Sequence, residues 1–355
     1  MTVDVDVLVV GGGPVGLACA IEARLAGMSV VVVEPRSGSL DKACGEALMP
    51  GAVDALLRLG VKPAGHSIAG FAYLNATRSV EYRFTGGLGV GVRRTALSDA
   101  LMARAHQLGV QFRRGTVEAV EQSSNCVTMG IRTPLSLEAS NYVRASWVLA
   151  CDGLHSHVRK LLGLEKPSHQ VRGQRRFGLR RHFEVEPWTD LVEVHWARST
   201  EVYVTPVASN IVGVATLGAP GIDFDREIGA IPSLQSRLRG AEPVGQLRGA
   251  GPLLQKTRRR VEGRVLLVGD SSGYVDALTG EGLRVGFAQA HLAVAALASG
   301  DSSGYERAWV RHTRDYRMLT TGLVGLASSP LRSVIVPLAS AMPWVFGAVV
   351  QRLAR

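Results

Sequence analysis

The sequence predicts an α/β protein in which a parallel sheet is interrupted by an antiparallel sheet. Three observations predict this fold class. A glycine-rich loop joins an apolar strand to a helix near the N-terminus, short runs of alternating polarity fill the middle of the chain, and apolar strands return after them. With 355 residues and 46% hydrophobic content, the chain is long enough for two domains.

The first 34 residues predict the dinucleotide site. An apolar strand over 4–10 runs into a G-x-G-x-x-G loop at Gly11, Gly13 and Gly16, and a helix then leads to a second apolar strand that ends at Glu34. The glycines permit a tight turn, a close approach of backbone N–H groups to a pyrophosphate, and close packing of the helix. The helix N-terminus favours phosphate. Glu34 is placed to accept hydrogen bonds from a ribose diol.

Hydrophobic periodicity and turn residues predict the remaining elements in chain order. We expect a helix over 52–59, a pair of strands within 68–84 and a helix over 94–108. Three strands follow over 110–121, 125–131 and 142–150, and an antiparallel meander fills 170–254. The chain then forms a strand over 264–268 and a long apolar helix over 280–298. The dinucleotide domain is therefore discontinuous, formed by 1–68, 85–169 and 255–300. The substrate sheet takes 69–84 and 170–254, and an apolar helical tail takes 301–355.

The chain is basic, with a net charge of +10. A solvated arginine-rich surface accounts for this charge, as does attraction to an anionic cofactor or an anionic membrane. No nucleic-acid-binding motif is present, so we predict no nucleic-acid partner. One group of arginines offers a surface for an anionic nicotinamide cofactor, although a wet strand face is the commoner use; the group is Arg172, Arg175, Arg176, Arg180 and Arg181.

The cysteines and the N-terminus favour a cytoplasmic protein. Cys19, Cys44, Cys126 and Cys151 are scattered without a C-x-x-C motif, which predicts neither a disulfide framework nor a metal site. The chain enters its first strand without a basic region or cleavage site, so we expect no signal peptide. The alternative to a freely cytoplasmic protein is membrane association through the C-terminal tail.

The tail is almost uncharged from 322 to 350, broken only by Arg332. Its prolines, Pro330, Pro337 and Pro343, argue against one straight spanning helix. We expect either short helices packed over the substrate cavity or a surface that makes peripheral membrane contact through 322–355. Both alternatives imply a hydrophobic substrate.

Three further motifs accompany the glycine loop: RRTALSDAL at 93–101, LACDGLHSHVR at 149–159 and RVLLVGDSSGYVDALTGEGL at 264–283. Together the four resemble the family of FAD-dependent oxidoreductases that includes aromatic hydroxylases of the p-hydroxybenzoate hydroxylase type and geranylgeranyl reductases. The resemblance covers roughly residues 4–300. It implies a Rossmann-like FAD-binding fold of the glutathione reductase type with an inserted antiparallel β-sheet substrate domain. It also implies FAD as cofactor, NADPH or NADH as electron donor, and a hydrophobic small-molecule substrate.

The resemblance implies a role for each matched position. Asp270 would bind the ribityl chain, and the amides of 280–282 would face the flavin pyrimidine edge, where the helix dipole stabilises reduced flavin. Asp152 and Gly153 would link the pyrophosphate, and NAD(P)H, to the fold. Arg94 would contact the cofactor, although Arg93 beside it leaves that assignment open. The predicted cofactor-binding residues are Gly11, Gly13, Pro14, Val15, Gly16, Glu34, Pro35, Arg36, Lys42, Cys44, Gly45, Arg94, Asp152, Gly153, Gly269, Asp270, Gly280, Glu281, Gly282 and Leu283.

The K-A-C-G segment at 42–45 is similar to the geranylgeranyl reductase branch, in which K-x-C-G lies beside the flavin ring. Cys44 is therefore the candidate catalytic residue, with a small buried apolar residue as the alternative. The substrate candidates are Tyr203 and Thr205. Their stretch, Tyr203–Val207, lacks the tryptophan and phenylalanine of the Y-x-W-x-F-P segment typical of those reductases.

Two chemistries follow from the resemblance. The Asp-Gly motif and the missing aromatic segment favour an NAD(P)H-dependent monooxygenase that hydroxylates a hydrophobic aromatic or polyketide-like substrate through a flavin C4a-hydroperoxide. Lys42–Gly45 and Gly280–Gly282 favour a reductase that saturates isoprenoid double bonds. A flavin-binding structural or sensor protein is the non-enzymatic alternative. We favour the monooxygenase.

Overall fold

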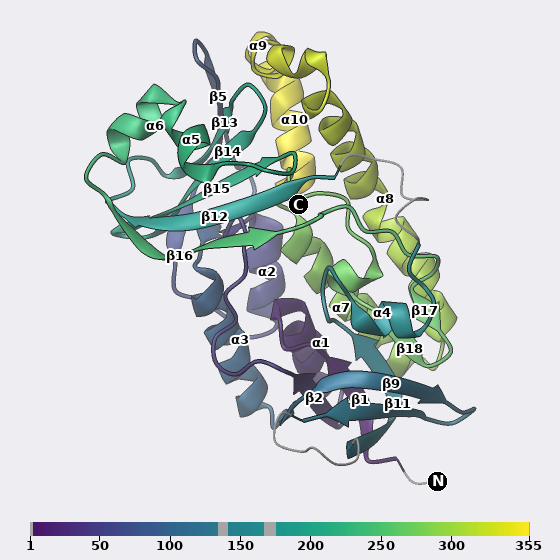
Figure 1. Cartoon of the computed structure of the whole chain (residues 1–355). Helices are drawn as coiled ribbons and strands as arrows, with labels where there is room; N and C mark the ends of the chain where they lie inside the picture. The colour runs from purple at the N-terminus through teal and green to yellow at the C-terminus, as the bar shows by residue number, and fades with distance from the viewer. Residues whose placement is uncertain (1–2, 134–140, 167–174, 355) are drawn as a thin grey trace.

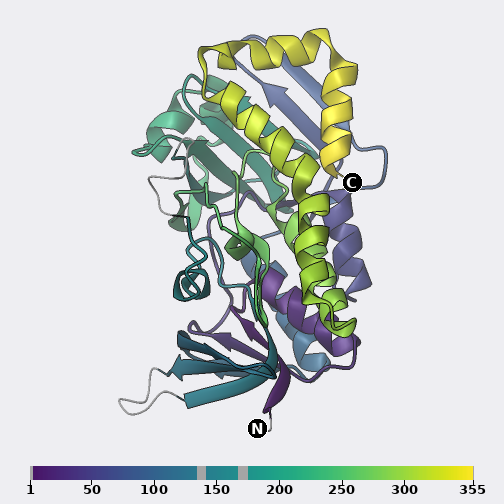
Figure 2. The same ribbon diagram turned by 90° about the vertical axis from the view of Figure 1, so that its right-hand side faces the viewer.

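The computed structural model describes residues 3–133, 141–166 and 175–354. Two large sheets occupy opposite ends of the molecule, and helices connect them (Figure 1). The N-terminus lies at the end with the eight-stranded sheet, and the C-terminal helices run along one side to the end with the seven-stranded sheet (Figure 2). The predicted boundary between 169 and 170 lies outside the described residues.

The eight-stranded sheet is the dinucleotide sheet. Its main path has the order β17-β18-β11-β1-β2-β8, and β10 and β9 extend it antiparallel from β11. The five strands from β18 to β8 are parallel. The strands are β1 (Val5–Val10), β2 (Val30–Glu34), β8 (Gln111–Arg114), β9 (Thr116–Gln122), β10 (Val127–Arg132), β11 (Asn141–Ala150), β17 (Val261–Glu262) and β18 (Val265–Leu267).

Both faces of this sheet are covered, which explains why its central strands are continuous apolar runs. The side chains of Val7 and Val9 in β1 pack with helices α1, α2, α3 and α7, whereas Leu8 and Val10 belong to the apolar cluster on the other face. Small residues let α1 approach closely, because a Cβ at Gly16 would lie 1.9 Å from the Gly11 carbonyl oxygen. The helices are α1 (Pro14–Leu25), α2 (Pro50–Arg58), α3 (Arg94–Gln107) and α7 (Gly282–Ala298).

The seven-stranded sheet has the order β16-β12-β15-β14-β13-β5-β6. All neighbours are antiparallel except β13 and β5, which are parallel. This corrects the expectation of a purely antiparallel sheet: β5 and β6 come from an earlier part of the chain, so no hairpin joins β5 to β13. The strands are β5 (Gly70–Leu74), β6 (Ser79–Arg83), β12 (Phe177–Glu184), β13 (Leu191–Trp196), β14 (Glu201–Ala208), β15 (Ile211–Gly218) and β16 (Glu242–Ala250).

The two faces of this sheet differ in role. One face carries Val202 and Val214 and packs under helices α5 and α6 through Phe224 and Leu234. The other face carries the alternate residues and meets the cofactor half of the molecule. Several short elements were not predicted: α4 (His157–Leu161), α5 (Phe224–Gly229), α6 (Pro232–Arg237), the 3₁₀ helix η2 (Gly269–Ser272) and a small sheet of β3 (Ala47–Leu48), β7 (Gly89–Gly91) and β4 (His66–Ile68).

The tail is helical, as predicted. It consists of α8 (Ser302–Ala327), the 3₁₀ helix η3 (Pro330–Val334), α9 (Ile335–Ala341) and α10 (Pro343–Ala354). α8 packs on α7, and α9 and α10 pack on β6. The ring centroid of Phe346 in α10 lies 4.6 Å from that of Tyr73 in β5. Of the two alternatives for the tail, packed helices are therefore present. Within the described residues, no single helix is long and apolar enough to cross a membrane.

Candidate cofactor and substrate site

A cavity of about 540 Å³ lies between the two large sheets. Its dinucleotide end is formed by the glycine loop and the carboxyl ends of β1 and β2, the position at which open α/β sheets bind ligands. Its other end is formed by the free face of the seven-stranded sheet. One continuous space therefore joins the predicted cofactor site to the predicted substrate sheet.

Most of the predicted cofactor-binding residues line this cavity. They are Gly11, Gly13, Pro14, Val15, Glu34, Pro35, Arg36, Lys42, Cys44, Gly45, Arg94, Asp152, Gly153, Asp270, Gly280, Gly282 and Leu283. Arg94 is among them and Arg93 is not, so the geometry favours Arg94. Cofactor contact by these residues stays a prediction.

Three predicted residues do not line the cavity. Gly16 and Gly269 serve packing, since a Cβ at Gly269 would lie 3.1 Å from a methyl carbon of Val15. Glu281 is buried and its carboxylate pairs with Arg284, so its side chain is not part of the cavity wall. Burial raises the pKa of Glu281 to about 7.

The glycine loop fits a pyrophosphate. Gly11 has φ +104°, and a Cβ there would lie 2.5 Å from the carbonyl oxygen of Cys151, so only glycine fits. A Cβ on Gly13 would meet no atom within 4 Å, so the space in front of it is open. Gly13 precedes α1, whose unpaired N–H groups and dipole favour an anion at this point. The residues present therefore fit the phosphates of a dinucleotide.

Glu34 already has partners in this structure. Its carboxylate accepts hydrogen bonds from the Gly12 N–H at 2.8 Å and from Nε of Arg36 at 2.7 Å. Arg36 is largely exposed, so its ion pair with Glu34 contributes little net stabilisation. A ribose hydroxyl would therefore compete with Arg36 rather than with the Gly12 amide, which braces the loop.

Asp270 presents a carboxylate to the cavity beside Lys42. Its Oδ2 lies 3.7 Å from the Lys42 Nζ, and both side chains are about one-third exposed. Across the residues that the structure describes, the Asp270 side chain has no other polar partner. It is thus free to accept hydrogen bonds from a polyol such as the ribityl chain.

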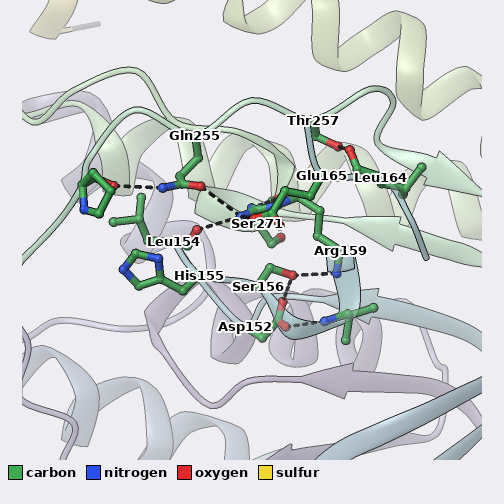
Figure 3. Close-up of polar contacts among 12 residues, drawn as sticks. Asp152, Leu154, His155, Ser156, Arg159, Leu164, Glu165, Gln255, Thr257 and Ser271 are labelled. Carbon is green, nitrogen blue, oxygen red and sulfur yellow. Dashed lines mark hydrogen bonds and ion pairs between the residues drawn. The ribbon is translucent and has the colours of Figure 1, made fainter. Parts of the chain in front are cut away.

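The Asp-Gly motif is bound to the Asp270 segment through a buried arginine (Figure 3). The Asp152 carboxylate accepts hydrogen bonds from the Ser156 hydroxyl at 2.6 Å and the Val158 N–H at 3.0 Å. Arg159, which is fully buried, donates to the carbonyl oxygens of Ser271 at 3.0 Å and Leu154 at 2.9 Å. The prediction missed Ser156 and Arg159, although a serine before a helix is a capping signal.

The segment 41–46 is held on the substrate sheet by buried polar contacts. Arg180 pairs with Asp41, and its Nη1 lies 3.1 Å from Nδ1 of His182. Nε2 of His182 lies 2.6 Å from a carboxylate oxygen of Glu46. The Thr205 hydroxyl donates to the Gly45 carbonyl oxygen at 2.8 Å. Strands β12 and β14 therefore position the segment that carries Lys42 and Cys44.

Glu46 shows that this position is under constraint. Among the described residues it is the only non-glycine residue with φ in the left-handed region, at 59°. Such a conformation costs about 1–3 kcal/mol and persists only where surrounding contacts hold it. Its other carboxylate oxygen accepts the Arg94 N–H at 2.8 Å. Glu46 thus joins the Cys44 segment, the start of α3 and the substrate sheet.

The arginine group proposed for nicotinamide binding is not one surface. Arg180 and Arg176 are buried, and Arg176 pairs with Glu201 and with Asp276 at 3.2 Å. The proposed nicotinamide surface is wrong for these two residues, because both side chains are buried and paired with carboxylates. Arg181 faces outward to Asp225, and Arg172 lies outside the described residues.

The substrate end of the cavity is mainly apolar. Tyr203 and Thr205 both line it, but the Tyr203 hydroxyl donates to the Leu278 carbonyl oxygen at 2.8 Å, which leaves its ring as the contact surface. Burial raises the pKa of Tyr203 well above its usual value. The other apolar residues at this end include Phe71, Tyr73, Val192, Val194, Ala215, Leu217, Leu253, Leu278 and Val350. Such a wall suits a hydrophobic ligand.

Comparisons with known proteins agree with this geometry. Residues 4–218 match the family described as FAD binding domain. The chain is 30% identical over 340 residues to the menaquinone reductase of Mycolicibacterium smegmatis, covering 87% of this chain and 80% of that protein. It is 29% identical to the 12-dehydrotetracycline 5-monooxygenase/anhydrotetracycline 6-monooxygenase of Streptomyces rimosus, covering 80% of this chain and 61% of that protein.

A second monooxygenase and a solved structure complete the comparison. The rifampicin monooxygenase of Streptomyces venezuelae is 29% identical, with 80% of this chain and 62% of that protein covered. The chain therefore spans less than two thirds of the length of either monooxygenase. A flavin-dependent brominase superposes with a TM-score of 0.83 at 17% identity, over 99% of this chain and 94% of the other, which is a likeness of fold.

Proposed function

This chain belongs to the FAD binding domain family, and on that premise we propose that it is an NAD(P)H-dependent monooxygenase that hydroxylates a hydrophobic aromatic or polyketide-like substrate. That it is an FAD-dependent oxidoreductase follows from the family and its relatives. The observation that carries the proposal is the single cavity, which joins the glycine loop and Asp270 to an apolar wall of the substrate sheet.

The residues that would hold FAD are those with free polar groups facing the cavity. The amides around Gly13 would bind the pyrophosphate, Glu34 a ribose, and Asp270 the ribityl chain. The N-terminus of α7 at Gly282 would place its dipole beside the flavin, where it stabilises negative charge. When bound, FAD would supply hydride acceptance from the nicotinamide and activation of dioxygen.

The chain's own residues would position the substrate and exclude water. Phe71, Val194 and Leu217 offer an apolar wall, so the substrate would be held by burial of its rings rather than by charge. The same wall would exclude water from the reacting centre. The tetracycline and rifampicin monooxygenases among the relatives support this proposal.

A reductase acting on a quinone-type isoprenoid substrate is the second candidate. Two observations favour it. The menaquinone reductase is matched over 80% of its length, more than either monooxygenase, and Lys42, Cys44 and Gly45 all line the cavity. On this alternative, Cys44 would lie beside the reacting double bond.

Stopped-flow reduction of the holoenzyme separates these candidates. The FAD-loaded protein would be mixed anaerobically with NADH or NADPH, with and without anhydrotetracycline, rifampicin, para-nitrophenol or menaquinone, and then exposed to ¹⁸O₂. A monooxygenase incorporates one ¹⁸O atom into the product. Anaerobic turnover that adds two hydrogens to menaquinone would instead establish the reductase. Flavin that no nicotinamide reduces contradicts the monooxygenase candidate.

We also propose peripheral membrane contact through 322–355, because a hydrophobic substrate partitions into bilayers. The support is the composition of the tail, which is uncharged between Arg332 and Arg352.

A further inference from the structure

The end of the tail exposes apolar side chains on its outer surface. We define the tip as residues 330–348, where η3 and α9 turn and α10 begins. Leu331 is 59% exposed, Leu338 49% and Trp344 76%, and Val334 is also exposed. The inner side of the same short helix α9 buries Ile335 and Val336. The tip is therefore apolar on its outer side as well as its inner side, which is typical of an interaction surface.

The one charge of the tip is turned inward. The Arg332 guanidinium pairs with Glu201 and donates to the carbonyl oxygens of Ala197 and Ala327, each at 2.8 Å. Its side chain is only 10% exposed. From Ser333 to Gln351 the sequence has no charged residue. The outer surface of the tip therefore carries no charged side chain, which is unusual for a surface that contacts only water.

Two cationic turns border this surface. Arg198 lies exposed in the β13–β14 turn, whose Ala197 carbonyl oxygen is bound by Arg332 of the tip. Arg78 lies exposed in the β5–β6 turn, and α9 packs on β6. Figures 1 and 2 place this turn and α9 at the same end of the molecule. An uncharged apolar surface with arginines at its border matches the interface of an anionic bilayer.

We propose that the tip docks on the surface of an anionic lipid bilayer and opens the substrate end of the cavity toward it. Leu331, Val334, Leu338 and Trp344 would enter the interface, where an indole is favoured, and Arg78 and Arg198 would bind lipid phosphates. The sharp turn suits an interfacial apex rather than a span, because α8 and the 330–341 segment meet at 100°.

The position of the cavity supports a bilayer as the partner. Phe346 packs on Tyr73 with its ring tilted by 54°, and Val350 lines the substrate end directly. Trp344 precedes Val350 by six residues of α10, or roughly 9 Å along the helix axis. A hydrophobic substrate dissolved in the bilayer would therefore meet the cavity close to the lipid surface. Docking of the tip deepens the membrane contact proposed for 322–355, and this last step rests in addition on the proposed oxidoreductase function.

Vesicle flotation of the full-length FAD-loaded protein tests the proposal. Vesicles of phosphatidylcholine alone would be compared with vesicles that contain phosphatidylglycerol. We expect binding to the anionic vesicles and a decrease of about tenfold or more in the double variant Leu338→Ser/Trp344→Ser, which loses two inserted apolar groups. The double variant Arg78→Gln/Arg198→Gln should lose about tenfold on anionic vesicles only, with a weaker salt dependence.

The matched control is Leu25→Ser/Leu57→Ser, which removes two equally exposed leucines from α1 and α2, away from the tip. It should bind like the wild type. FAD affinity and flavin reduction by NAD(P)H should be unchanged in every variant, so a failed oxidoreductase assay leaves the docking result readable. Wild-type protein that does not float with anionic vesicles overturns the proposal. An equal loss of vesicle binding in the control also overturns it. So does a tip variant that binds vesicles like the wild type and differs only in changing from a dimer to a monomer by light scattering.

Discussion

Two alanine substitutions in the glycine loop separate cofactor contact from packing. Gly13 has φ −71° and ψ 172°, which alanine adopts readily, and its added methyl meets no atom within 4 Å. Gly13→Ala should therefore cost at most about 1 kcal/mol of apoprotein stability, the penalty of alanine at a helix N-cap. The same methyl occupies the space where a pyrophosphate would approach the amides. Loss of one hydrogen bond from a loop amide to the charged pyrophosphate, worth about 1.5–3 kcal/mol, should raise the Kd for FAD by about 10- to 100-fold.

Gly16→Ala should instead damage the fold. Its Cβ would lie 1.9 Å from the Gly11 carbonyl oxygen, which is more than 1 Å inside normal contact, and that oxygen belongs to the backbone and cannot rotate away. Relief requires α1 to move from the loop, at about 1–3 kcal/mol. Both apoprotein stability and FAD affinity should fall.

Urea unfolding of apoprotein and fluorescence titration with FAD measure the two quantities separately. Gly322→Ala is the control, because it lies within α8 with open space around it and should gain about 0.5–1 kcal/mol without a change in FAD affinity. Wild-type FAD affinity in Gly13→Ala would refute the placement of the pyrophosphate. Equal destabilisation of apoprotein by both loop variants would show that the loop acts only through packing.

Three further outcomes are expected. Arg180→Gln should lower the free energy of unfolding measured in urea by about 3–5 kcal/mol, because it leaves the buried carboxylates around it without their cation. Arg181→Gln on the outer face should change it by less than about 1 kcal/mol. Equal values for the two variants would contradict the inward orientation of Arg180. Burial raises the pKa of Glu281 from 4.5 to about 7, so the folded state holds the proton more tightly and stability is lost as pH rises from 4.5 through 7. Glu281→Gln should flatten this part of the curve of stability against pH. An unchanged curve would refute the raised pKa of Glu281. Cys44→Ser should alter turnover while FAD stays bound, and a variant that loses its flavin would make Cys44 structural instead.

Local signals sufficed for the dinucleotide half of the molecule. The loop at 11–16, the acid at Glu34 and the apolar strands around them act within one βαβ unit, where each residue's role is set by backbone geometry close in sequence. The prediction of β1, α1 and β2 was correct within one or two residues. The helical tail was likewise predictable from its composition and prolines.

The substrate half depended on tertiary contacts. Alternation along β12 indicates two faces but not which of them meets the cavity. The apolar face, with Phe183, packs under α5 and α6, and so the polar side chains Arg180 and His182 point inward to the 41–46 segment. That reverses the usual order of apolar inside and polar outside. Burial of these charges depends on partners more than 130 residues away, and a local pattern carries no information about them.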